Sequence, residues 1–220
     1  MKHTRSRPKS ALLTTLLGAA WLLSSCSMLL PANSPPPTLF SFDSPETVIQ
    51  VEPVATIKVG APALIVSIPR AAPGFDSCQI VYIRRAHTFE YFRQSQWVDT
   101  PANMLAPLVI AALERSGGFS AVIQSPTSVV GQLRLDVEIV RLQHEFLMLP
   151  SQAHFTLRVH LLDTATRQVI AWREFDAMVA APSEDPYGSV LAANDAVRSV
   201  IKELVLFCRQ TVGNLPEIPP

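Results

Sequence analysis

The second half of the chain holds three segments in which apolar and polar residues alternate. They cover residues 133–139, 154–161 and about 168–180. Alternation with a period of two is typical of a strand that has one buried and one solvated face. In the third segment the apolar face shifts between Trp172 and Phe175, which indicates a β-bulge. Three such strands in succession predict a largely antiparallel sheet, and this limits the fold more than any other feature of the sequence.

Two other segments have helical spacing. Thr100 is a suitable N-cap before Pro101, and apolar residues follow at helical spacing as far as Leu113, with Pro107 inside. The dipeptide Asp185-Pro186 opens a second helix whose apolar stripe is formed by Tyr187, Val190, Leu191, Val197, Ile201, Leu204, Val205 and Cys208. The sequence therefore predicts an α+β fold with two layers, in which an antiparallel-rich sheet carries two main helices on one face.

Shorter strands are expected before the first helix. Apolar stretches at 39–42, 54–59 and 64–68 are separated by prolines, as edge strands often are. The segment 79–84 is apolar on both faces, and the aromatic-rich segment 88–92 is expected to pair with it.

The N-terminus has the three parts of a secretory signal. A basic stretch precedes the apolar run Ala11–Leu23, which is about 20 Å long as a helix and too short for a hydrocarbon core of about 30 Å. The run ends in Leu23-Ser24-Ser25-Cys26, which resembles the bacterial lipobox. That resemblance implies cleavage before Cys26 and acylation of Cys26, and Ser27 implies sorting to the outer membrane. The alternative is an uncleaved anchor or an ordinary signal peptide with a chance cysteine.

The chain is therefore expected to comprise four parts. These are a signal peptide (1–25), a lipidated N-terminus and proline-rich tether (26–37), one domain (38–211) and a proline-rich tail (212–220). Beyond the signal peptide there are 14 basic and 18 acidic residues, so the mature chain carries a net charge of −4. A mildly acidic domain lacks the basic surface that a phosphate backbone requires, which excludes nucleic acid as a partner.

The search for catalytic and metal-binding motifs is negative. The sequence has no glycine-rich nucleotide motif, no HExxH zinc motif and no GxSxG nucleophile elbow. His144, His154 and His160 are interpreted as solvated residues on the sheet rather than zinc ligands. Asp136 and Glu138 share one strand face and are interpreted as solubilising residues rather than an acid–base pair. We therefore expect no enzyme, no cofactor and no metal.

Aromatic residues and arginines are concentrated between Tyr82 and Trp97. The favoured interpretation is that the aromatic residues belong to the core, with Trp97 at a corner between strand and helix. The alternative is an apolar, arginine-rimmed surface for a protein or lipid partner. Its candidate residues are Tyr82, Arg84, Tyr91 and Arg93.

Several of these segments resemble the ABC-type transport auxiliary lipoprotein family. The resemblance rests on the segments Gln79–Arg85, Tyr91–Arg93, Gln96–Pro101, Met104-Leu105 and Gly118-Phe119, and it covers residues 38–210. It implies an outer-membrane lipoprotein, similar in organisation to the paraquat-inducible protein C lipoproteins. Such a protein would be a non-catalytic auxiliary component of a system that moves lipids between the inner and outer membranes. Of its functional positions only Cys26, the lipid attachment site, carries over.

The resemblance also implies partners. They are an inner-membrane ABC permease and ATPase, a periplasmic protein of the mammalian-cell-entry (MCE) type, and the membrane that holds the acyl chains; self-association into a homo-oligomer is a further candidate. The alternatives are a pilotin-like assembly lipoprotein for another outer-membrane complex and, more remotely, a lipid-modified enzyme. The sequence does not say which lipid is moved or in which direction.

Once Cys26 is acylated, Cys78 and Cys208 are the remaining cysteines. An even number of thiols in an oxidising periplasm predicts a disulfide between them, and we do not regard this pair as a feature of the whole family. The alternative is two unrelated buried thiols, since free cysteine is among the most buried residue types.

Overall fold

The computed structural model describes residues 35–44 and 60–215. The chain divides into two units, Met1–Pro36 and Pro37–Pro220, and the fold below is that of the second. The signal peptide, Cys26 and the strand predicted at 54–59 lie outside the described residues. The elements are β1 (Thr38–Phe40), β2 (Ala63–Val66), β3 (Arg70–Ala71), β4 (Gln79–Ile83), β5 (Glu90–Trp97), α3 (Pro101–Arg115), β6 (Ala121–Gln124), β7 (Leu133–Glu145), β8 (Gln152–Asp163), β9 (Val169–Ala180) and α4 (Pro186–Gly213).

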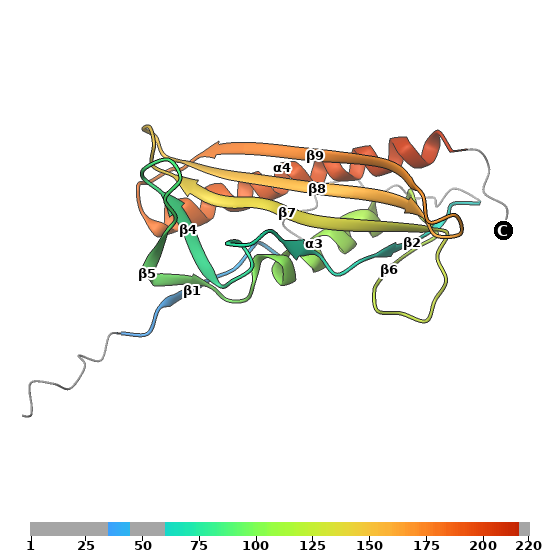
Figure 1. Ribbon diagram of the computed structural model, residues 1–220, viewed down its shortest axis with the longest axis horizontal. Coiled ribbons are helices and arrows are strands. Elements are labelled where there is room, and N and C mark those ends of the chain that lie inside the picture. Colours follow the sequence, from blue (N-terminus) through green and yellow to red (C-terminus); the bar gives the residue numbers. More distant parts are fainter. Residues whose placement is uncertain (1–34, 45–59, 216–220) are drawn as a thin grey trace, which may run out of the picture. The chain divides into compact units, whose positions relative to one another are not determined.

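The strands of the described residues form one mixed sheet of nine strands (Figure 1). The long strand β7 is its centre: it pairs antiparallel with β8 and parallel with β2, β3 and β4. On the far side β8 pairs antiparallel with β9, where Leu157 lies opposite Phe175. The α+β, two-layer prediction is confirmed, and the longest pairings, β7–β8 and β8–β9, are antiparallel as expected. The bulge predicted between Trp172 and Phe175 lies slightly earlier in β9, where Ala171 pairs with Leu161 and Val169 with Leu162.

Both helices begin at the caps that the sequence predicts. The Thr100 hydroxyl accepts a hydrogen bond from Asn103 N at the start of α3, and the Asp185 carboxylate accepts one from Gly188 N at the start of α4. Pro107 lies inside α3, as expected. With 28 residues, α4 is about 42 Å long, so it can cover the full length of the long strands.

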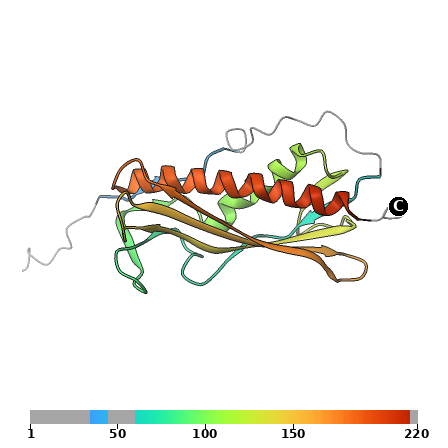
Figure 2. The same ribbon diagram turned by 90° about the horizontal axis from the view of Figure 1, so that it is seen from above.

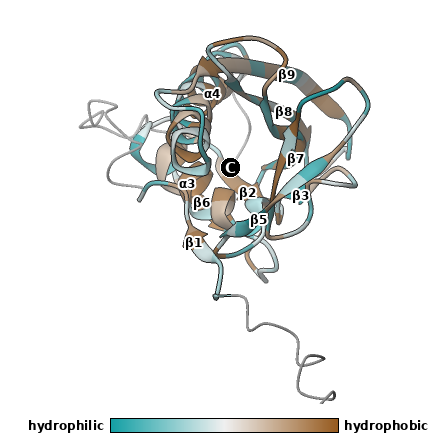
Figure 3. Ribbon diagram, turned by 90° about the vertical axis from the view of Figure 1, so that its left-hand side faces the viewer, coloured by the Kyte–Doolittle hydropathy of each residue, from teal (hydrophilic) through white to brown (hydrophobic). Residues whose placement is uncertain are grey.

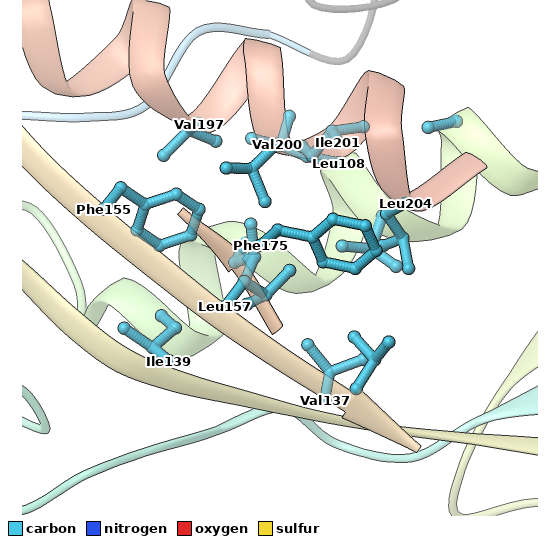
Figure 4. Packing of buried hydrophobic residues seen from close by; sticks show 14 of the residues in the cluster. Leu108, Val137, Ile139, Phe155, Leu157, Phe175, Val197, Val200, Ile201 and Leu204 are labelled. Carbon is cyan, nitrogen blue, oxygen red and sulfur yellow. The ribbon is translucent and has the colours of Figure 1, made fainter. Parts of the chain in front are cut away.

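The helices cover one face of the sheet and enclose the core. Figure 2 shows α4 running along the sheet, and the end-on view of Figure 3 shows α3 and α4 opposite the strands β7, β8 and β9. In the core, Phe155 and Leu157 of β8 and Phe175 of β9 face α4 (Figure 4). Their partners on the two helices are Val197, Val200, Ile201, Leu204 and Leu108. Inward positions of the strands and one stripe of each helix therefore form a single hydrophobic cluster.

The first strand is held against α4 by polar contacts. Asp43 N donates a hydrogen bond to Asn194 Oδ1 (2.7 Å), and Asn194 Nδ2 donates to Ser41 O (3.4 Å). Arg198 forms an ion pair with Asp43 at 2.6 Å. These contacts fix the direction in which the chain enters the domain, because β1 lies only a few residues upstream of them.

Candidate functional site at one end of the sheet

Two strand turns meet at one end of the sheet, and we call this end the sheet tip. It consists of the β4–β5 turn (residues 84–89) and the β7–β8 turn (residues 146–151), and it lies at the left-hand side of Figure 1. The turns meet because β4 and β7 are parallel neighbours, with Tyr82 opposite His144 and Ile83 opposite Glu145. Phe146 N donates a hydrogen bond to Ile83 O (2.8 Å), which fastens the second turn to the first.

An aromatic cluster fills the base of the sheet tip. The rings of Tyr82 and Phe92 lie 4.5 Å apart between centroids, and Phe146 packs edge-on against Tyr82 at 5.7 Å. His144 completes the group, with its ring 4.6 Å from that of Phe146. Offset and edge-on contacts of this kind make a rigid base for the residues that project beyond it.

Tyr82 and Arg84 are joined through Glu90. Arg84 Nε donates to Glu90 Oε1 (3.1 Å), a second guanidinium nitrogen pairs with Oε2 of the same carboxylate, and Tyr82 OH donates to Oε2 (3.2 Å). The Arg84 guanidinium also lies over the Tyr82 ring, 5.4 Å from its centroid. The hydrogen bond from Arg84 holds the pKa of Glu90 below its usual range. These two predicted surface residues therefore belong to one small polar network.

The other two predicted surface residues lie on the opposite face of the strand. Tyr82 pairs with Glu90 and Val81 pairs with Tyr91, so Tyr82 and Tyr91 point to opposite faces because successive strand residues alternate. Arg93 follows Tyr91 by two positions and shares its face, and both are exposed. The structure thus divides the four candidates into two pairs. Trp97 is buried against Phe42, with ring centroids 5.2 Å apart, which confirms its predicted place in the core. The favoured core assignment is wrong for Phe89 and Tyr91, which are 45% and 40% exposed.

A buried histidine pairs with a serine next to the sheet tip. His144 is 2% exposed, its Nε2 lies 2.7 Å from Ser151 Oγ, and its Nδ1 has no hydrogen-bond partner among the described residues. Burial lowers the pKa of His144 to about 4, although Glu184 and Glu145 partly oppose this. Ser151 N in turn donates to Glu184 Oε1 (3.0 Å). His144 is therefore neutral at physiological pH, and its burial and its contact with Ser151 indicate a structural role.

A second histidine lies between two carboxylates on β7 and β9. His154 Nδ1 is 2.9 Å from Glu145 Oε1, and its Nε2 is 2.8 Å from Asp176 Oδ1. Arg141 Nη1 lies 3.1 Å from both ring nitrogens, so it sits over the imidazole. Burial alone would raise the pKa of Asp176, but hydrogen bonds from Thr156 and His154 outweigh it and lower that pKa. The interpretation of His144 and His154 as solvated residues is therefore wrong, since both are buried.

One small cavity lies beside this end of the sheet. A cavity of about 10 Å³, lined by Val81, Trp97, His144, Ala153 and others, is about the size of a single water and cannot admit an acyl chain. Within residues 35–44 and 60–215, no group of three His, Cys, Asp or Glu side chains could hold a metal ion. None of the helices in those ranges is long and apolar enough to span a bilayer.

Cys78 and Cys208 are both free thiols, so the prediction of a disulfide is corrected. Cys78 O accepts a hydrogen bond from Trp97 N, and Trp97 packs on Phe42, beside the Asp43–Asn194 contact. Cys208 lies about 21 Å further along α4 than Asn194, whereas a disulfide needs Cα atoms about 4.4–6.8 Å apart. The two cysteines therefore lie at different positions along the axis of α4.

One feature of the sheet tip was not predicted from the sequence. Leu147, Met148 and Leu149 project from the β7–β8 turn and are 51%, 64% and 79% exposed. The signal was present in the sequence as an uninterrupted apolar run between two alternating segments, where a hairpin turn is normally polar.

Comparison with known proteins identifies the family. The family model described as ABC-type transport auxiliary lipoprotein component matches residues 45–205. The crystal structure of protein XCC0632 from Xanthomonas campestris, of family DUF330, superimposes with a TM-score of 0.68. It is 22% identical, and the match covers 79% of this chain and 96% of that one. A second structure, of an uncharacterized protein, has a TM-score of 0.60 at 9% identity and covers 78% of this chain and 98% of the other.

These structural likenesses show a shared fold, and no curated protein matches the chain. The family match covers well over half of the sequence, including α3, most of α4 and the strands from β2 to β9. The chain therefore belongs to the ABC-type transport auxiliary lipoprotein component family.

Proposed function

We propose that this protein is a lipid-anchored periplasmic lipoprotein of the outer membrane. In this proposal it acts as a non-catalytic auxiliary component of an ABC transport system of the MCE type, which moves lipids between the inner and outer membranes. The observation that carries the proposal is the family match over residues 45–205, on a chain that also has a lipobox ending at Cys26.

The anchor follows from the chemistry of acylation. Each buried methylene contributes about 0.8 kcal/mol, so the two or three chains of an acylated Cys26 hold a protein stably on a bilayer. The tether 27–37, with its proline-rich half, reaches about 34 Å when extended. The domain therefore works within a few nanometres of the membrane that holds the anchor.

In this proposal the folded domain contributes a surface to the transport system. Of the four predicted partner residues, Tyr91 and Arg93 retain this role in our proposal, because they are exposed and lie on a face without the Tyr82–Arg84–Glu90 network. Exposed aromatic residues and arginines are the types that contribute most to protein interfaces. We assign this face to the MCE-type component, which connects the domain to the inner-membrane permease and ATPase.

Photo-crosslinking in cells tests the proposal. Tyr91→p-benzoylphenylalanine should give an adduct that mass spectrometry identifies as an MCE-domain protein. Trp172→p-benzoylphenylalanine is the matched control, because Trp172 is an exposed aromatic residue on the distant strand β9 and should give no such adduct. An adduct with a secretin or pilus component would instead favour the pilotin-like alternative and contradict the proposal.

A further inference from the structure

The apolar residues of the β7–β8 turn, Leu147, Met148 and Leu149, are held out from the domain by fixed points on both sides. On one side Phe146 packs on Tyr82 and bonds to Ile83 O. On the other, Ser151 N donates to Glu184, and Ser151 O accepts from Ala181 N (2.7 Å). The turn therefore presents three consecutive large apolar side chains between two points that are fixed to the domain.

The neighbouring turn adds positive charge and a further aromatic residue. Arg85 is exposed in the β4–β5 turn, and Phe89, at the end of that turn, is also exposed. Arg84 is exposed too, but its guanidinium is paired with Glu90. Exposed contiguous apolar groups bordered by polar ones mark sites of protein or membrane interaction. Long arginine side chains can lie along an apolar surface while their guanidinium groups reach lipid phosphates.

The direction of the first strand separates these two kinds of partner. β1 runs parallel to β5, with Thr38 opposite Ser95 and Phe40 opposite Trp97. Because β5 begins at the β4–β5 turn and β1 runs parallel to it, the N-terminal end of β1 faces the sheet tip. Asn194 and Arg198 hold the segment just after β1 on α4, so this direction is fixed by the fold.

We propose that Leu147, Met148 and Leu149 insert into the interface of the bilayer that holds the acylated Cys26, with Arg85 at the level of the lipid phosphates. The inference rests on the proposed function, because it requires the lipid anchor. Three side chains on one turn are too few to hold a free protein on a membrane. On an anchored protein the contact becomes intramolecular at a high effective concentration, so the turn needs only to orient the domain.

Fluorescence quenching in vesicles tests this orientation. The full mature lipoprotein carrying Met148→Trp is reconstituted into phosphatidylethanolamine–phosphatidylglycerol vesicles with brominated or unbrominated acyl chains. Val130→Trp is the matched control, because Val130 is 85% exposed in the β6–β7 loop, near the other end of β7 about 40 Å away. The unsubstituted protein gives the background emission of Trp97 and Trp172.

We expect brominated chains to quench the added emission of Met148→Trp and vesicles to shift it to the blue, with neither change for Val130→Trp. Equal quenching at both positions, or none at Met148→Trp in protein that floats with the vesicles, would overturn the inference. Failure of the unsubstituted protein to float with the vesicles would instead count against the anchor and the proposed function.

Hydrogen exchange on the native sequence gives a second measurement that needs no substitution at the turn. Amides of residues 147–149 should exchange more slowly in the vesicle-anchored protein than in the soluble Cys26→Ser form, while those of 127–131 should not change. Protection that appears only when a periplasmic protein partner is added would assign the turn to that partner and refute membrane insertion.

Discussion

His144 shows how a single bulge changes the role of a residue. The inward positions of β7 are Leu135, Val137 and Ile139, but the register shifts between Ile139 and Arg141. After that shift the buried residues are Leu142 and His144, so the histidine faces inward beside Leu142. The alternation of apolar and polar residues predicts the strand correctly but assigns residues 141–145 to the wrong face. A bulge leaves no clear mark in a single sequence, so the change of face could not be predicted.

The buried imidazole makes stability depend on pH. Its pKa of about 4 in the folded state lies below the unfolded value near 6.5, so the unfolded chain takes up the proton first as the pH falls. The free energy of unfolding should therefore decrease by about 2 kcal/mol between pH 7 and pH 5 through this residue alone. Urea denaturation of the wild type and His144→Gln at both pH values measures it. The variant should show the smaller decrease, and equal decreases would contradict the burial argument.

The two free thiols should differ sharply in reactivity. Cys208 is fully buried on α4, and burial raises its pKa to about 12, so it remains a protonated thiol. Cys78 is partly exposed in the segment before β4. Under native conditions iodoacetamide should modify Cys78 well before Cys208, as followed by peptide mass spectrometry, because the thiolate is the reactive form. Recovery of a Cys78–Cys208 disulfide peptide would contradict the structure.

Among the helices and strands, the features predicted correctly are those that depend on residue spacing within a single segment. The caps of α3 and α4, the antiparallel strands β7–β9 and the core position of Trp97 all follow from spacing within one segment. The parallel pairings of β7 with β2, β3 and β4 were not predicted. These strands have only two to five residues and are separated from β7 by long stretches of sequence. The spacing of apolar residues within a strand does not indicate which distant strand it pairs with.

Trp97 is the last residue of β5 and is packed into the core just before α3 begins. It is 3% exposed, its ring contacts Phe42, and its backbone N–H donates to Cys78 O (2.8 Å). Trp97→Ala should lower the free energy of unfolding by about 3–5 kcal/mol, because it leaves a large cavity in the core. Trp172→Ala removes an exposed tryptophan and should stay within about 0.5 kcal/mol of the wild type. Equal effects in urea denaturation would contradict the core assignment of Trp97.

Asn194 holds the N-terminal segment on α4. Its side chain bonds to the backbone of Ser41, Asp43 and Val190 and is nearly buried. Asn194→Ala should cost about 1–3 kcal/mol, because Asp43 N loses its acceptor, and hydrogen exchange in residues 38–43 should accelerate. Asp195→Ala is the neighbouring control: it removes only an exposed ion pair with Arg198 and should change stability little. Unchanged exchange in the Asn194 variant would show that β1 is held by other contacts.

For the whole molecule, the fold and the family membership support different conclusions. The two-layer domain and its resemblance to the XCC0632 structure show the architecture. The auxiliary role comes from family membership, and the membrane location from the lipobox. The sequence predicted the family and the fold class. It did not separate the Tyr82–Arg84 face from the Tyr91–Arg93 face, because that division depends on the pairing of β4 with β5.

Acylation of Cys26 is the central claim, since the proposed transport role and the membrane contact of the β7–β8 turn both depend on it. Labelling with radioactive palmitate, followed by separation of inner and outer membranes, tests the claim directly. The wild-type protein should incorporate the label and sediment with the outer membrane, whereas Cys26→Ser should take up no label and leave the outer-membrane fraction. Palmitate in the Cys26→Ser protein, or its unchanged sedimentation with the outer membrane, would contradict the account.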